Sequence, residues 1–372
     1  MVVEIRQVRG SRDLRRFVGF PLWLYRDNPY YVPQLLSDEI NTLSPDRNPA
    51  FEHCEARYWL AIRDGRVVGR IAGIVNHKFP LVWGKKWARF GWIDFVDDYE
   101  VSAALLGAVE DWARSLGMEA VHGPMGFCGL DREGMLIKGF DELGTMATIY
   151  NYPYYPVHLE KLGYTKDTDM VEYELDADSV PERVHRIARM VMNRGSYRLL
   201  DAKRPKDLLP YADEVLSLLD EAYAHLYGAV PLSDRQKQAL IKQYFSYVNP
   251  DYCKVVLDAE GRIAAFGLAM PSLSRSLQKA RGRLVPFGFF HILRALKRND
   301  TLDLYLIAVR PELQGKGINA VIMSEIARAA KKHGIRKAET NPEWEENNKV
   351  QSQWKDFAVR QHKLRRIYVK HL

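Results

Sequence analysis

Cysteine is scarce in this chain: Cys54, Cys128 and Cys253 are the only three among 372 residues. They lie far apart and form no CxxC pair, so neither a set of disulfides nor a structural zinc site is expected. The ten histidines include no HExxH or HxH pattern, which removes sequence support for a catalytic metal. This usage is typical of a protein of a reducing compartment that uses no metal.

Long apolar runs are also missing. The longest, residues 284–296, is interrupted by Pro286, Gly288, His291 and Arg294, and is too short and too polar to cross a bilayer. Residues 1–17 contain no apolar core behind a basic start, so they do not resemble a signal peptide. We therefore expect a cytoplasmic location.

The composition is that of a folded protein, with 47% hydrophobic and 11% aromatic residues. A single hydrophobic core seldom grows beyond about 250–300 residues, so two domains are expected. The polar segment 175–181, which ends in Pro181, is the best boundary and divides the chain into residues 1–178 and 179–372. The net charge of +7 allows an anionic partner without selecting one.

The two halves repeat one order of elements. A hairpin with an Asp/Gly turn comes first, then another strand, and then a helix that ends before a glycine. The strands are expected at residues 58–63, 67–75 and 88–96 in the first half and at 254–257, 263–270 and 302–309 in the second, and the helices at 102–115 and 318–332. This pattern predicts an α/β (α+β) fold of two domains, each a twisted, mixed, mainly antiparallel sheet flanked by helices.

The most informative stretch is the loop at residues 309–319, between a strand and a helix. Gly315 and Gly317 have no Cβ, so the backbone can approach a bulky anion closely. The first amides of a helix have no internal acceptor, and the helix dipole is positive there, which favours phosphate oxygens. Lys316 adds a positive charge. The loop matches neither GxxxxGK[ST] nor GxGxxG, so it is neither a P-loop nor a dinucleotide fingerprint.

This loop resembles the signature of the GNAT superfamily, the Gcn5-related N-acetyltransferases. The matching residues are Val309, Pro311, Gln314 and Gly317, whereas Asn319 departs from the Gly or Ala of the pattern. The resemblance implies that the backbone from Gln314 to Asn319, with Gly315, Lys316 and Ile318, binds the pyrophosphate of acetyl-CoA or another acyl-CoA. The segment Asn347-x-x-Val350-x-x-x-Trp354 is similar to the family's Asn-x-x-Ala-x-x-x-Tyr helix, which implies cofactor contacts for Asn347 and Trp354.

The first half resembles the same fold more faintly, through residues 158–164 near its end. At the place of the phosphate loop it has Asp97, Asp98, Tyr99 and Glu100, and three carboxylates would repel a pyrophosphate. We expect a degenerate GNAT-like domain that shapes the acceptor site. Tandem domains of this kind also occur in the Fem-type aminoacyltransferases.

The resemblance also indicates where proton transfer would take place. Trp354 stands at the position of the family's usual Tyr acid, and it cannot donate a phenolic proton, so Tyr305 and Tyr368 are the candidate acids. Glu339, or Asp303 on the preceding strand, is the candidate base. The amide of Ala308 or Val309 is the expected oxyanion contact.

Two further segments carry possible binding residues. The stretch 123–144 contains six glycines and leads to Tyr150, Tyr152 and Tyr154, which suit either an acceptor cleft or a rigid packed turn. Residues 275–298 contain seven basic and no acidic residues, interleaved with aromatic and aliphatic ones. They suit a lid, a packing element, or a contact with anionic lipid.

The resulting hypothesis is an N-acyltransferase, by its family an N-acetyltransferase, that moves an acyl group from acyl-CoA to a small-molecule or peptide amine. No specific nucleic acid is expected. Two alternatives remain: an aminoacyl-tRNA-dependent transferase of Fem type, and a non-catalytic ligand sensor on the same scaffold.

Overall fold

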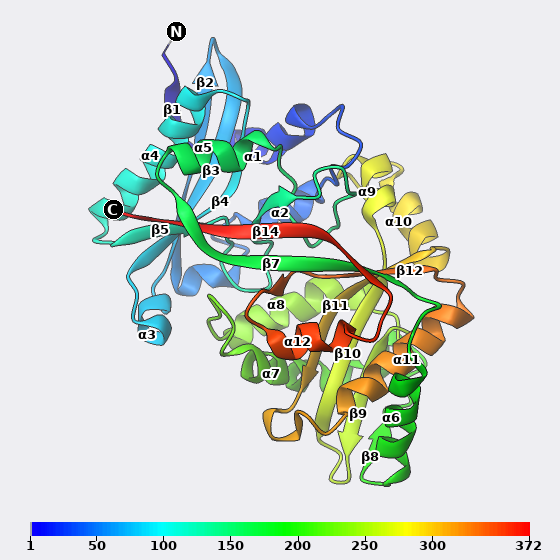
Figure 1. The fold of residues 1–372 in the computed structure, drawn as a ribbon. Coiled ribbons are helices and arrows are strands. Elements are labelled where there is room, and N and C mark those ends of the chain that lie inside the picture. The colour runs from blue at the N-terminus through cyan, green and yellow to red at the C-terminus, as the bar shows by residue number, and fades with distance from the viewer. Residues whose placement is uncertain (1) are drawn as a thin grey trace. The chain divides into compact units, whose positions relative to one another are not determined.

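The computed structural model describes residues 2–372 (Figure 1). Its strands are β1 (Glu4–Gln7), β2 (Cys54–Arg63), β3 (Arg66–Asn76), β4 (Trp87–Phe95), β5 (Ala120–Gly123), β6 (Met135–Lys138), β7 (Thr165–Asp176), β8 (Tyr197–Leu199), β9 (Cys253–Asp258), β10 (Ile263–Pro271), β11 (Thr301–Val309), β12 (Lys337–Thr340), β13 (Glu343–Trp344) and β14 (Val359–His371). Its α-helices are α1 (Gly10–Leu24), α2 (Leu36–Thr42), α3 (Phe79–Trp83), α4 (Tyr99–Ser115), α5 (Tyr154–Lys161), α6 (Glu182–Asn193), α7 (Ala212–Tyr223), α8 (Asp234–Tyr244), α9 (Ser274–Ala280), α10 (Gly288–Lys297), α11 (Ile318–Lys332) and α12 (Asn348–Gln351).

The chain forms two compact units. Unit 1 comprises Met1–Val171, Ser274–His291 and His362–Leu372, and unit 2 comprises Glu172–Leu273 and Ile292–Gln361. The change of unit at Glu172 lies close to the predicted boundary at residue 178. The segments Ser274–His291 and His362–Leu372 nevertheless belong to unit 1. A single division of the chain at residue 178 would assign both of them to the second domain.

The predicted repeat of elements is present in both units. In unit 1, β2, β3 and β4 are antiparallel, α4 follows, and β5 runs parallel to β4. In unit 2, β9, β10 and β11 are antiparallel, α11 follows, and β12 runs parallel to β11. Each unit is therefore a mixed, mainly antiparallel sheet with flanking helices, as predicted.

In each unit, the last strand of the repeat pairs with a further strand that is distant from it in the sequence. In unit 1, β14 pairs antiparallel with β5, with Tyr368 opposite Gly123. In unit 2, the end of β7 pairs antiparallel with β12, with Glu174 opposite Glu339. The last strand of the chain thus completes the sheet of the N-terminal half.

Glycines allow the central helix of each repeat to approach its sheet. A Cβ on Gly73 of β3 would lie 2.8 Å from the Trp112 ring of α4. A Cβ on Gly267 of β10 would lie 2.2 Å from Ile322 Cγ2 of α11. Ile318 and Ile322 are buried in the core of unit 2, so α11 packs one apolar face against the sheet.

Candidate functional site: an uncapped helix start beside a diverging strand pair

The predicted phosphate loop links β11 to α11 in unit 2. A short 3₁₀ turn, Pro311–Leu313, is followed by Gly315 and Gly317, which have left-handed φ values of +75° and +81°. Gly317 is the N-cap of α11 and supplies no side-chain acceptor for the first helical amides. The Ala320 amide donates to Gly317 O at 3.1 Å. The amides before it, of Ile318 and Asn319, have no acceptor in a preceding helical turn, so the start of α11 can bind an anion.

Helix α6 supports the loop from one side. A Cβ on Gly317 would lie 2.8 Å from Ile187 Cγ2 and 3.4 Å from Val191 Cγ2, both on α6. Position 317 therefore requires glycine for two reasons, because its φ is left-handed and because α6 leaves no room for a side chain. The sequence predicted a close approach of the backbone to an anion at Gly317, but neither of these two reasons.

The structure brings together the two segments that were predicted to hold the cofactor. Lys349 Nζ donates to Gln314 Oε1 at 3.3 Å, and Asn319 Nδ2 donates to Gln353 Oε1 at 3.1 Å. Asn347 is the N-cap of α12, and its side chain accepts a hydrogen bond from the Val350 amide at 3.3 Å. Lys349 is exposed and adds a second cation beside the exposed Lys316, which the motif alone did not reveal.

Strands β11 and β12 diverge close to this loop. Their parallel pairing extends from Thr301 opposite Lys337 to Leu304 opposite Thr340, and β11 then continues to Val309 along β10 alone. At the divergence, the side chain of Asn341 donates to Tyr305 O at 3.2 Å. Tyr305 is itself an extra residue in the strand, because Leu304 pairs with Ala269 whereas Leu306 pairs with Leu268.

Backbone hydrogen bonds along β11 show which of its amides points away from β10, toward the side where β12 has diverged. The Arg310 amide donates to Ala264 O of β10, and Ile307 O accepts from the Tyr223 hydroxyl of α7 instead of from β10. Since backbone groups alternate sides along a strand, the Val309 amide points away from β10 and the Ala308 amide points toward it. Of the two predicted oxyanion contacts, Val309 therefore has the suitable orientation.

Glu343 is a candidate residue that sequence reasoning missed. It lies on β13, just after the divergence, and its two carboxylate oxygens share a bifurcated hydrogen bond from Trp354 Nε1 at 2.8 and 3.1 Å. Burial raises the pKa of Glu343 to about 7, although the bond from Trp354 acts in the opposite direction. Burial also raises the pKa of Tyr223 to about 12, and the nearby Glu343 adds to that shift. A carboxyl group with this pKa can exchange a proton at neutral pH.

The three predicted catalytic residues lie in different surroundings. Tyr305 is in unit 2, and its buried hydroxyl approaches Asp303 Oδ2 at 3.5 Å; burial, and then Asp303, raise its pKa well above the ordinary value. Glu339 is on β12, in register with Asp303 on one side and Glu174 on the other. Tyr368 belongs to unit 1, where its hydroxyl donates to Glu160 Oε1 at 3.0 Å. The catalytic roles of all three stay predictions.

The predicted acceptor tyrosines are packed within unit 1. The hydroxyl groups of Tyr150, Tyr152 and Tyr154 donate to the carbonyl oxygens of Phe140, Leu24 and Phe95 at 2.9, 3.3 and 2.6 Å. Their rings also contact one another in sequence order. These contacts show what the tyrosines do for the fold, and their part in acceptor binding stays a prediction.

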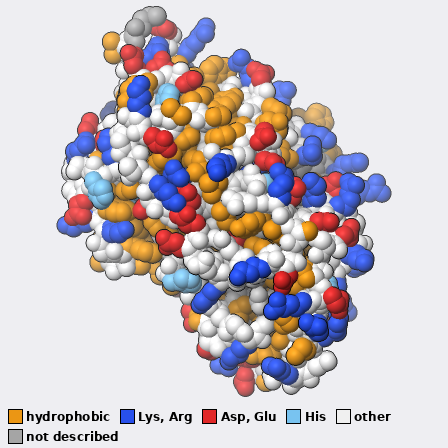
Figure 2. Space-filling model, in the orientation of Figure 1, with side chains coloured by type: hydrophobic (Ala, Val, Ile, Leu, Met, Phe, Trp, Pro, Cys, Tyr) orange, Lys and Arg blue, Asp and Glu red, His pale blue; other side chains and the backbone are white. Residues whose placement is uncertain are grey.

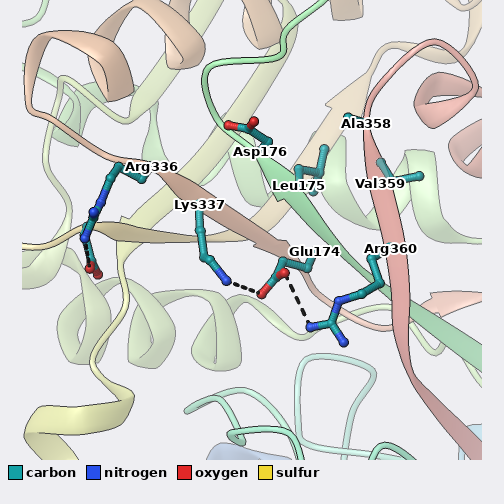
Figure 3. Close-up of a pocket in the computed structure, with 9 residues that line it drawn as sticks. Glu174, Leu175, Asp176, Arg336, Lys337, Ala358, Val359 and Arg360 are labelled. Carbon is teal, nitrogen blue, oxygen red and sulfur yellow. Dashed lines mark hydrogen bonds and ion pairs between the residues drawn. The ribbon is translucent and has the colours of Figure 1, made fainter.

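A hollow of about 580 Å³ in unit 2 lies away from this loop (Figure 3). It opens at the start of β12, whereas the loop follows the opposite end of β11. Its cationic side chains are paired: Lys337 and Arg360 with Glu174 at 3.0 and 3.4 Å, and Arg336 with Asp300 at 3.0 Å. The hollow therefore does not have the unneutralised cations of an anion site.

Residues 2–372 have neither a metal-binding cluster nor a membrane-spanning helix. No group of three or more His, Cys, Asp or Glu side chains in this range is placed to hold a metal ion. No helix within it is long and apolar enough to cross a membrane.

The chain is similar to known proteins over most of its length. Residues 213–350 match the model of the Acetyltransferase (GNAT) family. This range includes β11, the loop at residues 309–319 and α11. The chain is 28% identical over 322 residues to Protein YghO of Escherichia coli, an alignment that covers 86% of this chain and 81% of that protein. It is also 28% identical over 302 residues to Bacterial ceramide synthase of Caulobacter vibrioides, covering 79% and 77% of the two chains.

Solved structures with the same fold span the full chain. A tandem GNAT protein from the clavulanic acid biosynthesis pathway superposes with a TM-score of 0.57 at 12% identity, covering 99% of this chain and 98% of that one. A GCN5-related N-acetyltransferase from Sphaerobacter thermophilus gives a TM-score of 0.52 at 11% identity, with 99% and 95% covered. Residues 213–350 thus match the GNAT acetyltransferase family, and the chain as a whole has the fold of tandem GNAT proteins.

Proposed function

We propose that the protein is an N-acyltransferase that moves an acyl group from acyl-CoA to the amine of a long-chain base. The observation that carries the proposal is the uncapped start of α11 at Gly317, with Lys316 and Lys349 beside it. Backbone amides and two cations suit the diphosphate of coenzyme A. GNAT-family membership supports acyl transfer in general.

The proposed acceptor and acyl length come from one relative. A ceramide is a long-chain base whose amine carries an acyl group, and a relative of similar length is called Bacterial ceramide synthase. A long acyl group and a long-chain amine are therefore a better proposal than the acetyl group and unspecified amine expected from the motif alone.

In the proposed reaction, the amine nitrogen attacks the thioester carbonyl carbon, and the C–S bond breaks after a tetrahedral intermediate. Glu343 takes the proton that the amine loses, because its pKa of about 7 allows it to accept a proton at neutral pH. The Val309 amide stabilises the oxyanion. The departing thiolate takes up a proton, for which Tyr305 in the same unit is our proposed donor.

The test is an assay of amide formation. The purified protein is incubated with acetyl-CoA or palmitoyl-CoA and with a long-chain base, a polyamine or a lysine peptide. Amide is measured by mass spectrometry, and free thiol is measured in parallel. We expect palmitoyl-CoA and the long-chain base to give the largest kcat/KM, with one thiol released for each amide formed.

Two variants make the test sharper. Glu343→Gln should lower kcat at pH 7 by about 100-fold or more, within the usual range for loss of a general base, with little change in acyl-CoA binding. Glu346→Gln, at an exposed position close by, is the control. Acyl-CoA binding without amide from any donor–amine pair would contradict the proposal and favour a ligand sensor, and amide formation only from charged tRNA would favour the Fem-type alternative.

A further inference from the structure

A second surface of the protein lies outside the phosphate loop. We define the basic-aromatic segment as residues 281–298, the turn after α9 together with α10. It contains five cations and no Asp or Glu: Arg281, Arg283, Arg294, Lys297 and Arg298. Figure 2 shows Lys and Arg side chains gathered, at the upper right, over the region of α9 and α10. All five cations are exposed.

The backbone at the start of this segment is held firmly. Gln278, on α9, donates to the carbonyl oxygens of Pro29 and Tyr31 at 2.8 and 3.0 Å. Gly282 O accepts from the Leu36 amide at 2.9 Å, and a Cβ on Gly282 would lie 2.3 Å from Gln34 O. The turn is therefore anchored within unit 1 and presents its side chains from a fixed backbone.

The apolar side chains of the segment are nevertheless exposed to solvent. The exposed fractions are 79% for Val285, 69% for Phe287, 40% for Phe289, 57% for Phe290 and 51% for Leu293. Only one side of α10 packs against the protein, where Ile292 is 4% exposed. Phe290, Leu293 and Lys297 are spaced three and four residues apart, so these exposed side chains share the outer side of the helix. A cluster of large exposed apolar groups within a few turns of chain marks an interaction surface.

The combination of groups indicates the kind of partner. A helix with aromatic and aliphatic residues on its outer side and with Lys and Arg around them is suited to the boundary between lipid headgroups and acyl chains. Charge of one sign favours an anionic leaflet, to which each Lys or Arg near the surface adds attraction. A protein interface of the usual kind would have charges of both signs at its rim, which this segment does not have.

We infer that the basic-aromatic segment docks the protein on an anionic membrane surface, with Phe287, Phe290 and Leu293 inserted and the five cations at the lipid phosphates. The docking is peripheral, and it requires neither acyl-CoA nor turnover. The docking can therefore be tested independently of the proposed acyl transfer.

The test is co-sedimentation of the full chain with phosphatidylcholine vesicles that contain or lack 30% phosphatidylglycerol. We expect binding to the anionic vesicles that is at least tenfold stronger than binding to the neutral ones. Phe290→Ser/Leu293→Ser removes the apolar contact, and Arg294→Glu/Lys297→Glu removes the charge contact. Each double variant should weaken binding at least tenfold, and since all four positions are exposed, both variants should keep the wild-type melting temperature.

Two controls match these changes. Leu81→Ser removes an apolar side chain that is 84% exposed in unit 1. Arg12→Glu/Arg15→Glu changes the net charge by the same amount at two exposed positions on α1. Both controls should bind anionic vesicles like the wild type.

Three results would overturn the inference. The wild type could stay in the supernatant with anionic vesicles, or the segment variants could bind like the wild type. Retention on an RNA column that is lost only in the charge variant, without any vesicle binding, would assign the segment to nucleic acid instead.

Discussion

Asp98 and Gly317 are the N-cap residues of α4 and α11, the helices that occupy the same place in the two repeats. Asp98 accepts hydrogen bonds from the Glu100 and Val101 amides at 3.0 and 3.4 Å and forms an ion pair with Arg63. Gly317 has no side chain and leaves the first amides of α11 unoccupied by a cap. The same helix start is therefore closed in one repeat by the protein's own carboxylate and open to an anion in the other.

Gly317→Asp should abolish the rise in melting temperature that we expect coenzyme A to produce, because the substitution puts bulk and negative charge at the proposed phosphate site. It should also destabilise the free protein by about 1–3 kcal/mol, since the new side chain meets Ile187 and φ is left-handed. Gly334→Asp is the matched control, with a φ of +70° and open space at the other end of α11. Equal ligand shifts in the two variants would place the cofactor elsewhere.

Asp98→Ala should lower the free energy of unfolding at pH 7 by about 1 kcal/mol through loss of the cap. Burial acts to raise the pKa of Asp98, but the bonds from Arg63 and the two amides outweigh it and hold the pKa below its ordinary value. A lowered carboxyl pKa stabilises the fold above the unfolded-state pKa and ceases to do so as the pH falls through the folded-state pKa. Urea titrations should therefore show a large difference from wild type at pH 7 that shrinks in acid.

The control for this prediction is Asp111→Ala, an exposed position on the same helix. Its effect should stay within about 0.5 kcal/mol at either pH. Should Asp98→Ala behave in the same way, Asp98 does not cap α4 in solution.

Glu343→Gln should stabilise the protein in mild alkali. Burial raises the pKa of Glu343 from 4.5 to about 7, so the folded protein holds more protons than the unfolded chain between these two pH values. Stability then falls as the pH rises through this window, and the loss is complete above it. Glutamine removes this penalty, so the variant should gain about 1–2 kcal/mol over wild type at pH 8 and almost nothing at pH 4. Denaturant unfolding at both pH values measures it, and a gain of equal size at both would contradict the raised pKa.

Trp354→Phe should shift the pH dependence of the proposed reaction. The indole N–H of Trp354 stabilises the Glu343 carboxylate, so its loss raises the pKa of Glu343 further. The alkaline rise in kcat should move upward by about one pH unit, while the phenyl ring retains most of the packing against Phe357. Trp344→Phe, in the same region, serves as the comparison, and an unchanged profile in Trp354→Phe would separate Glu343 from the chemistry.

Lys349→Ala should weaken coenzyme A binding about fivefold, which corresponds to about 1 kcal/mol. The lysine lies beside Gln314 and can reach an anion at the loop. Binding of pantetheine, which has no diphosphate, should not change. Lys331→Ala, exposed near the far end of α11, is the control, and calorimetry with both ligands measures the difference. A similar loss for both ligands would mean that Lys349 does not contact the diphosphate.

The elements that carry the site were predictable because their signals are local. Helix α11 begins at Ile318 and ends at Lys332 as predicted, since a glycine pair precedes it and its isoleucines recur at helical spacing. Strand β11 ends at Val309, also as predicted. The acidic start of α4 likewise indicated the copy whose helix start differs, and the structure shows that Asp98 caps it.

The proposed role of Glu343 could not be predicted in the same way. A glutamate next to a tryptophan in the sequence has no distinguishing pattern, and its pKa depends on burial and on Trp354, which are known only when the chain is folded. Glu339 was the more obvious choice because its strand was recognisable, but its neighbours across the sheet are the carboxylates of Asp303 and Glu174.

The sequence by itself determined the repeated order of elements, the open helix start at Gly317 and the charge of one sign along residues 281–298, because each depends on residues a few positions apart. Only the tertiary structure decided that β14 pairs with β5, that β7 pairs with β12, and that α6 leaves no room for a side chain at position 317. Strand pairing and close packing join residues separated by a hundred positions or more, and no local pattern encodes which distant strand will supply the missing hydrogen bonds.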